Sequence, residues 1–255
     1  MSVDPNRPSA ARIYDCYLGG RHNFAVDRAM AERALALVPD ISRIARANRA
    51  FLDRAVRHAA GRGIRQFLDI GSGIPAEGNV HEIARSIDPQ ARVVYVDIDP
   101  AAVVHARQIL DGDPLTTVVQ ADLLQAAQIL GDPRVKALLD PDEPVCLLLV
   151  ALLHFVPDTP ELREALRAYH DALVPGSILV VSHATRAVAE LADLYTRTGL
   201  STVPRDEAEL AGLIEGWEPV APGLVRSPLW RPEPGGDADD DSAGFALLVA
   251  VAERV

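Results

Sequence analysis

The segment Arg65–Pro75, which reads RQFLDIGSGIP, constrains this chain more than any other. An apolar run ends at Ile70, Gly71 and Gly73 follow at once, and a helical pattern begins near Glu77. This order predicts a strand, a tight glycine turn and a helix. Glycine has no Cβ, so such a turn can adopt unusual backbone angles and bring backbone N–H groups close to a ligand, as nucleotide-binding turns require.

Two further strand patterns end in acidic residues. The β-branched run Arg92–Asp97 leads into Ile98 and Asp99, and the run Leu115–Gln120 leads into Asp122. In a parallel α/β sheet the carboxyl ends of the strands meet at one crevice, where an acid after the second strand accepts hydrogen bonds from ribose hydroxyls. The pattern therefore predicts a pocket for a nucleoside whose ribose and exocyclic amine donate to carboxylates.

From residue 64 onward strand and helix patterns alternate, which predicts a doubly wound, mostly parallel α/β sheet of seven strands. The expected strands are 65–70, 92–97, 115–119, 145–150, 177–181, 220–226 and 245–252. The expected helices are 77–87, 100–110, 125–139 with a break at 131–133, 159–173, 186–197 and 205–215.

Residues 9–60 read as three helices. Ser9 is expected to cap the first helix, Asp27 lies near the start of the second, and Pro39 and Asp40 open the third. We therefore expect an N-terminal helical cap, residues 1–60, followed by the sheet domain, residues 61–255. Asn48 falls within the apolar stripe of the third helix, where its amide is either satisfied by protein or faces the ligand crevice.

Length and charge narrow the classes of function. A chain of 255 residues with 49% hydrophobic content can bury a full core. The formal net charge of −11, despite ten arginines against six acids in residues 1–60, argues against binding to a nucleic-acid backbone. The opening residues lack the apolar core of a signal peptide, and no run approaches the roughly 18 apolar residues of a membrane span. We expect no membrane contact, a cytoplasmic location, and reduced thiols at Cys16 and Cys146.

Several motifs are similar to those of a known enzyme family. Leu68–Gly73 resembles the glycine motif of class I S-adenosylmethionine-dependent methyltransferases, Val96–Asp99 their ribose-binding acid, and Gln120–Leu123 the segment beside adenine. More narrowly, the stretches 11–15, 18–24 and 48–52 resemble an actinobacterial, DUF574-like group of predicted methyltransferases whose substrates are not established. Pro75 stands where the family motif often has a third glycine, so a stiffer turn is expected.

The resemblance implies a Rossmann-like fold whose seventh strand runs antiparallel, S-adenosyl-L-methionine as cofactor, and methyl transfer to an acceptor. No Asn/Asp-Pro-Pro-Tyr motif follows the fourth strand, so a small-molecule acceptor is expected rather than a nucleic-acid base. The resemblance also implies that the segment 18–24 is a lid, to which Tyr14 and Tyr17 belong, although glycine and asparagine turn chemistry alone is equally consistent with an ordinary helix connection. The expected cofactor-binding residues are Asp69, Gly71, Ser72, Gly73, Asp97, Ile98, Asp122, Leu123 and Ala151, joined by Tyr14, Gly20 and Asn23 of the lid.

Catalytic residues are harder to predict, because methyl transfer from a sulfonium mainly needs alignment and exclusion of water. His154 follows the fourth strand and is the candidate general base, the alternative being that it anchors its loop, and His183 raises the same question. No metal-ligand spacing occurs, and the acidic run Asp237–Asp241 is expected to be an exposed, mobile loop rather than a calcium site.

Two other functions remain open from the sequence. A noncatalytic S-adenosylmethionine-binding protein would keep the same crevice. An NAD-dependent oxidoreductase also uses a glycine turn and an acid after the second strand, but Pro75 and the lack of a clean G-x-G-x-x-G pattern weigh against it.

Overall fold

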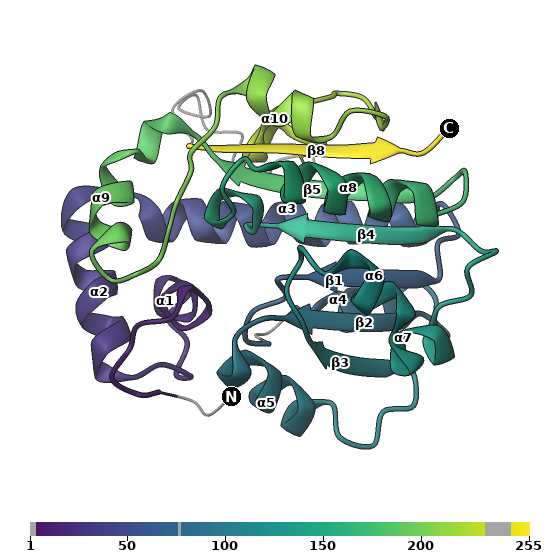
Figure 1. Ribbon diagram of the computed structural model, residues 1–255, viewed down its shortest axis with the longest axis horizontal. Helices are drawn as coiled ribbons and strands as arrows, with labels where there is room; N and C mark the ends of the chain where they lie inside the picture. The colour runs from purple at the N-terminus through teal and green to yellow at the C-terminus, as the bar shows by residue number, and fades with distance from the viewer. Residues whose placement is uncertain (1–3, 76–77, 233–245) are drawn as a thin grey trace.

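A computed structural model describes residues 4–75, 78–232 and 246–255 of the chain. It contains one mostly parallel β-sheet with helices on both faces (Figure 1). Within the described residues the strands are β1 Gln66–Ile70, β2 Arg92–Asp97, β3 Thr116–Gln120, β4 Val145–Val150, β5 Ile178–Ala184, β6 Glu218–Pro219, β7 Val225–Arg226 and β8 Leu247–Glu253.

The strand order is β3-β2-β1-β4-β5-β8-β6, with β7 also paired to β8. Strands β1 to β5 run parallel to one another, and β8 is antiparallel to β5, as expected. The order reverses between β1 and β4, so the chain leaves these two strands in opposite directions. Such a switch point opens a crevice at the carboxyl ends of the strands, where ligands of α/β sheets bind.

The expected single strand 220–226 is wrong in detail. The structure has two short strands there, β6 and β7, and both pair with β8. Between them the N–H of Gly223 donates to the carbonyl of Val220, which closes a turn, and Pro222 has no N–H to give to a ladder. The described part of the sheet therefore has eight strands instead of seven. The acidic run Asp237–Asp241 lies outside the described residues.

The helices also follow the expected alternation. Their bounds are α1 Ala10–Tyr17, α2 Ala25–Leu37, α3 Ile41–Gly61, α4 Val80–Arg85, α5 Pro100–Ile109, α6 Ala126–Gly131, α7 Pro133–Leu138, α8 Pro160–Ala172, α9 Glu190–Thr196 and α10 Glu207–Leu213. The expected break at 131–133 is confirmed, since Asp132 ends α6 and accepts a hydrogen bond at the start of α7. The helix expected to start near Glu77 starts later, since Asn79 is the N-cap of α4; Glu77 itself lies outside the described residues.

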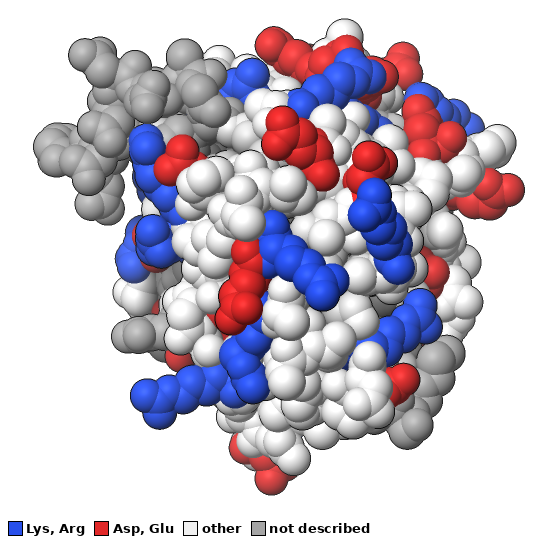
Figure 2. Space-filling model, turned by 90° about the vertical axis from the view of Figure 1, so that its left-hand side faces the viewer, with Lys and Arg blue, Asp and Glu red and all other residues white. Residues whose placement is uncertain are grey.

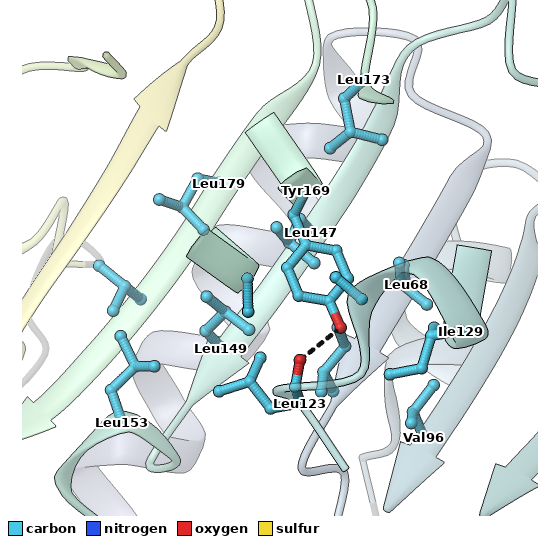
Figure 3. Packing of buried hydrophobic residues seen from close by; sticks show 14 of the residues in the cluster. Leu68, Val96, Leu123, Ile129, Leu147, Leu149, Leu153, Tyr169, Leu173 and Leu179 are labelled. Carbon is cyan, nitrogen blue, oxygen red and sulfur yellow. Dashed lines mark hydrogen bonds between the residues drawn. The ribbon is translucent and has the colours of Figure 1, made fainter. Parts of the chain in front are cut away.

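Two apolar clusters hold the layers together. One face of the sheet packs against α3, α4 and α5, and the other against α6, α7, α8 and α10. On the second face the buried Tyr169 ring of α8 lies among leucines of the strands, and its hydroxyl donates to the carbonyl of Leu123 at 2.9 Å (Figure 3). This bond ties α8 to the loop that follows β3, which is part of the crevice.

Helix α3 belongs to two environments. Its second half, including Phe51 and Val56, packs on the sheet. Its first half, including Ile41 and Ala45, packs with α1, α2 and α9 in a separate third cluster. Figure 1 shows these three helices beyond the carboxyl ends of the strands. Helix α3 therefore connects the sheet to the helices that lie beside the crevice.

The turn after β1 needs glycine for two reasons: its backbone angles and the close packing of a neighbouring side chain. Gly71 and Gly73 have φ values of 74° and 67°, in the left-handed region that favours glycine. A Cβ on Gly71 would lie 2.6 Å from a methyl carbon of Leu152, whereas a Cβ on Gly73 would meet nothing within 4 Å. Gly71 therefore lets the loop after β4 pack against the turn, and Gly73 faces open space.

These two glycines form a matched pair for a stability experiment. Both Gly71→Ala and Gly73→Ala should cost ~1–2 kcal/mol of unfolding free energy for the left-handed backbone angle. Gly71→Ala should cost about 1–3 kcal/mol more, because the added methyl overlaps Leu152. Urea denaturation followed by circular dichroism measures both losses, and equal losses would contradict the close-packing role of Gly71.

Candidate functional site

A cavity of about 810 Å³ lies at the carboxyl ends of the strands. Its volume falls within the ~300–1,000 Å³ typical of small-molecule and cofactor sites. The loops after β1, β2, β3 and β4 line it, together with α1, the first half of α3 and the region of α9. These lining segments include residues 69–74, 97–100, 121–124 and 150–152. The three strand ends that the sequence singled out therefore meet in one cavity.

The backbone N–H groups of the glycine turn donate hydrogen bonds to other residues of the protein. Gly71 and Ser72 donate to the carbonyl of Val96, at 2.7 and 3.1 Å, and Gly73 donates to Asp97 Oδ2 at 2.7 Å. From the sequence we expected these N–H groups to lie close to a ligand, but all three donate to residues of β2. What the turn offers instead is the Cβ-free side of Gly73, where nothing lies within 4 Å.

Asp97 links the glycine turn to the end of β2. Its Oδ2 accepts from Gly73, its Oδ1 accepts from the N–H of Asp99 at 2.8 Å, and the side chain lines the cavity. Burial raises the pKa of Asp97 to about 6, against the lowering effect of these backbone hydrogen bonds. Each carboxylate oxygen has a second lone pair, so both can still accept from a ligand.

Asp69 at the end of β1 also lines the cavity and is 7% exposed. Burial raises its pKa to about 7, the positive charge of Arg49 lowers it, and the carboxylate of Asp97 raises it further. The Arg49 guanidinium also donates to the carbonyl of Gly78 at 2.6 Å. The cavity thus contains a carboxyl group that changes charge near neutral pH.

The loop after β3 holds Asp122 at the cavity. Its Oδ1 accepts from the N–H of Leu124 at 2.9 Å, which fixes the turn, and Leu123 beside it is buried. Across from this loop, Ile98 is 61% exposed although it is a large apolar residue. An exposed isoleucine and a leucine at a cavity edge suit the flat faces of a base, and a carboxylate suits its exocyclic amine.

The loop after β4 carries a strained residue. Ala151 lines the cavity with a φ of 53°, unusual for a residue other than glycine, and its N–H donates to Ser182 Oγ at 2.8 Å. The hydrogen bond to β5 holds this conformation, which brings Leu152 against Gly71. The loops after β1 and β4 therefore support one another.

His154 is held as a neutral side chain. Its Nδ1 accepts from the N–H of Ala184 at 3.4 Å, and burial together with His183 and Arg205 lowers its pKa to about 3. The proton of the ring is then on Nε2, so His154 has no basic nitrogen free at neutral pH. This geometry favours the loop-anchoring alternative over a general base.

Arg205 organises this region and was not foreseen from the sequence. It is 3% exposed and donates to the carbonyls of Leu153 and Val156, each at 2.8 Å, and to His183 Nε2 at 3.0 Å. The other nitrogen of His183 donates to the carbonyl of Ala184 at 2.6 Å, so His183 is also anchored. No local pattern in the sequence marks Arg205, because its partners lie some 20 to 50 residues away.

The three expected lid residues have different places. Tyr14 lines the cavity, whereas Gly20 and Asn23 are absent from its lining. Asn23 Nδ2 donates to Asp15 Oδ2 at 2.7 Å, and a Cβ on Gly20 would lie 2.0 Å from Asp15 Oδ1. Gly20 and Asn23 therefore shape the turn around Asp15 and do not contact the cavity directly.

The segment before α1 crosses the edge of the cavity. The Ser9 hydroxyl makes no cap to α1, contrary to expectation, and donates to Asp99 Oδ2 instead. The buried Arg12 pairs with Asp27 through Nε at 2.6 Å and lies 3.9 Å from Asp99. These bonds join α1 to α2 and to the turn after β2, so the N-terminal segment closes one side of the cavity.

The cap side of the surface carries mixed charges. Figure 2, which faces the side of α2 and α9, shows basic and acidic side chains interspersed over a largely uncharged surface. Across residues 4–75, 78–232 and 246–255, no helix is both long and apolar enough for a membrane span, and no three potential ligand side chains gather as a metal site would need.

The raised pKa of Asp69 predicts how stability varies with pH. A carboxyl whose folded pKa is about 7 opposes folding when ionised, so the cost is present at pH 8 and relieved at pH 5. Asp69→Asn, which stays neutral, should raise the unfolding free energy at pH 8 by about 1 kcal/mol or more and change it less at pH 5. Urea denaturation at the two pH values measures the difference.

Asp132→Asn is the control, because its hydrogen bond with Arg134 lowers the pKa of Asp132. Asp132 is ionised at both pH 5 and pH 8, so its substitution should have the same effect at both. A gain for Asp69→Asn that does not depend on pH would refute the buried-charge explanation.

Comparisons with known proteins identify the family of the chain. The model of the S-adenosyl methyltransferase family matches residues 1–254. The crystal structure of a "putative methyltransferase" from Thermobifida fusca is 37% identical, with a TM-score of 0.92, covering 98% of this chain and 96% of that one. A DUF574 family protein from Streptomyces avermitilis is 35% identical, with a TM-score of 0.94 and full coverage of both chains.

A more distant structure has the same fold. The N-methyltransferase NodS of Bradyrhizobium japonicum, in complex with S-adenosylhomocysteine, is 18% identical, with a TM-score of 0.51 over 83% of this chain and 87% of that one. Among proteins of curated function, none matches. The family match over almost the whole sequence and the two similar actinobacterial structures lead to one conclusion: the chain belongs to the S-adenosyl methyltransferase family, whose cofactor is S-adenosylmethionine.

Proposed function

We propose that this protein transfers the methyl group of S-adenosylmethionine to a small-molecule acceptor. The observation that carries the proposal is the meeting of Asp69, Asp97 and Asp122 with the open side of Gly73 in one cavity. Three strand-end carboxylates and a surface without a Cβ are what an adenosyl ligand with a bulky sulfonium arm requires.

The residues at the cavity fit this cofactor. Asp97 would accept from the ribose hydroxyls through the lone pairs that Gly73 and Asp99 leave free. Asp122 would accept from the adenine amine, with Ile98 on a face of the ring. The glycine turn, Ser72, Leu123 and Ala151 would border the cofactor, and Asp69 would lie near its amino acid portion.

When bound, S-adenosylmethionine supplies a methyl group already activated by a positive sulfur. The chain's own task is then to hold the acceptor in line with that methyl group and to keep water out. The loop around His154 contributes by position, since its neutral, anchored ring accepts no proton at neutral pH. An acceptor proton would therefore leave by a route other than His154.

A small acceptor is supported by how the cavity is covered. Residues 1–60 are proposed to form the cap, with the segment 18–24 as its lid, joined by Tyr14 and Tyr17 of α1. Side chains of α1, including Tyr14 and Tyr17, line the cavity together with Tyr195 of α9. A polymer would have to displace these helices to reach the glycine turn, whereas a small molecule would not.

Asp97→Ala tests the assigned cofactor site. The substitution should weaken binding of S-adenosylhomocysteine by ~1.5–3 kcal/mol, as expected for lost hydrogen bonds to a charged group. Isothermal titration calorimetry measures the affinity, and Asp111→Ala, an exposed change after α5, is the control. Unchanged affinity in a folded Asp97→Ala protein would refute the ribose role.

The same titration separates the alternatives. If the proposed function is right, the protein binds S-adenosylmethionine and S-adenosylhomocysteine and does not bind NAD. A labelled methyl group should then pass from S-adenosylmethionine to a component of a small-molecule extract, and Asp97→Ala should slow the transfer when S-adenosylmethionine is below saturation. Binding without any transfer would support the noncatalytic alternative.

Ser9→Ala tests whether the segment before α1 helps to retain the ligand in the cavity. Loss of its hydrogen bond to Asp99 should weaken S-adenosylhomocysteine binding by about 0.5–1.5 kcal/mol, mainly through faster dissociation. Stopped-flow displacement measures the rate. Ser86→Ala is the matched control, because its hydroxyl bonds to the carbonyl of Ile83. Equal dissociation rates in both variants would show that closure by this segment does not retain the ligand.

A further inference from the structure

His154 has one ring nitrogen bonded within the protein and one that is not. Its Nδ1 accepts from the N–H of Ala184, so the ring proton is on Nε2. Among the described residues Nε2 has no hydrogen-bond partner, and it is not one of the fully buried polar atoms that lack one, so it keeps accessible surface. Because His154 lines the cavity and is only half-buried, this N–H is open to a bound molecule.

The part of the cavity around His154 differs in charge from the rest. We call the lining residues between 150 and 204 the donor wall, and within the described residues His154 is its only acidic or basic side chain. The six aspartates and three arginines that line the cavity all lie between residues 4 and 122. The N–H of Val203 donates to the carbonyl of His154 at 2.7 Å, which places the segment 201–204 beside it.

Helix α1 adds charged groups to the cavity, but these are engaged within the protein. Arg12 pairs with Asp27 at 2.6 Å. Asp15 accepts from the N–H of His22 at 2.9 Å and from Asn23 at 2.7 Å. The His154 N–H is therefore a donor that the protein itself does not use.

A buried positive charge lies behind the donor wall. Arg205 is 3% exposed, is absent from the cavity lining and makes no ion pair with any described residue. The two carboxylates that act on its charge, Asp158 and Glu209, pair with Arg163 and Arg186 instead. Buried charges are normally paired, so this one favours an anion on the other side of the wall.

Hydrogen bonds connect this charge to His154. Arg205 donates to Nε2 of His183 at 3.0 Å. His183 in turn donates through Nδ1 to the carbonyl of Ala184, whose N–H donates to Nδ1 of His154. Successive donors that start at a cation polarise one another, which makes the last one, the Nε2–H of His154, a better donor to an anion.

We propose that the methyl acceptor is a small organic anion whose carboxylate accepts a hydrogen bond from His154 Nε2–H. The inference rests on the proposed function and names its substrate class. His154 is a binding residue here, because its N–H holds the anionic oxygen and takes no proton. Phe155, Leu191 and Tyr195 of the donor wall would contact the rest of the molecule.

The test uses three probes on the full-length protein saturated with S-adenosylhomocysteine. Benzoate carries the anionic oxygens, benzamide has nearly the same shape with a neutral oxygen, and benzylamine carries a positive charge at neutral pH. Calorimetry should show benzoate binding roughly tenfold more tightly than benzamide, because a hydrogen bond to a charged group is about twice as strong as one to a neutral group. Benzylamine should bind most weakly. This ranking in the unaltered protein needs no variant to fold.

Two variants of His154 test the donor itself. His154→Phe keeps a flat ring without the N–H and should remove the preference for benzoate over benzamide. His154→Gln keeps a side-chain N–H and should retain most of the preference. His170→Phe, the same change on α8 away from the cavity, is the control and should retain all of it. Each variant should bind S-adenosylhomocysteine within about twofold of the unaltered protein, which shows that it is folded.

Three outcomes overturn the proposal. They are a benzoate preference that survives His154→Phe, tighter binding of benzamide or benzylamine than of benzoate, and failure of all three probes to bind. Each is distinct from failure of the proposed function, which would appear as no binding of S-adenosylhomocysteine to the unaltered protein.

Discussion

The hydrogen bonds of Asp97 are the constraint on which the site depends. One carboxylate oxygen holds Gly73 and the other holds Asp99, so a single side chain joins the turn after β1 to the turn after β2. Gly71 then accepts Leu152 at a distance that no Cβ would allow, which brings in the loop after β4. The reversal of strand order between β1 and β4 opens the crevice, and the contacts of Asp97 and Gly71 hold together the loops that line it. The same carboxylate keeps lone pairs that could accept from the ribose in the proposed cofactor site, in addition to holding the two turns together.

This arrangement concentrates buried negative charge. Burial raises the pKa of Asp69 to about 7 and that of Asp97 to about 6, and Arg49 opposes the shift at Asp69. Without a ligand, the protein would be more stable if the Asp69 carboxylate were neutral, and such a cost is common where a site is built for a ligand. S-adenosylmethionine carries a sulfonium and an ammonium besides one carboxylate, so negative charge on Asp69 and Asp97 would favour its net positive charge in the proposed site. The site is thus electrostatically suited to the family's cofactor.

The N-terminal helices complete the cavity through contacts that reach far along the chain. Ser9 bonds to Asp99, Tyr17 to Tyr195, and α3 packs against both the cap helices and the sheet. Because α3 packs in both clusters, one continuous helix connects the N-terminal helices to the sheet.

The sequence by itself determined the features that depend on neighbouring residues. The parallel strands, the glycine turn, the break around Asp132 and the acids at the strand ends all follow from short patterns, and the structure confirms them. Only the tertiary structure decided which polar atoms are already used. In the structure the N–H groups of the glycine turn donate to β2, and the Ser9 hydroxyl donates to Asp99. Gly20 packs against Asp15, and Arg205 donates to two backbone carbonyls. Most of these partners lie tens of residues apart, and hydrogen bonds and close packing depend on distances in space that no local pattern encodes.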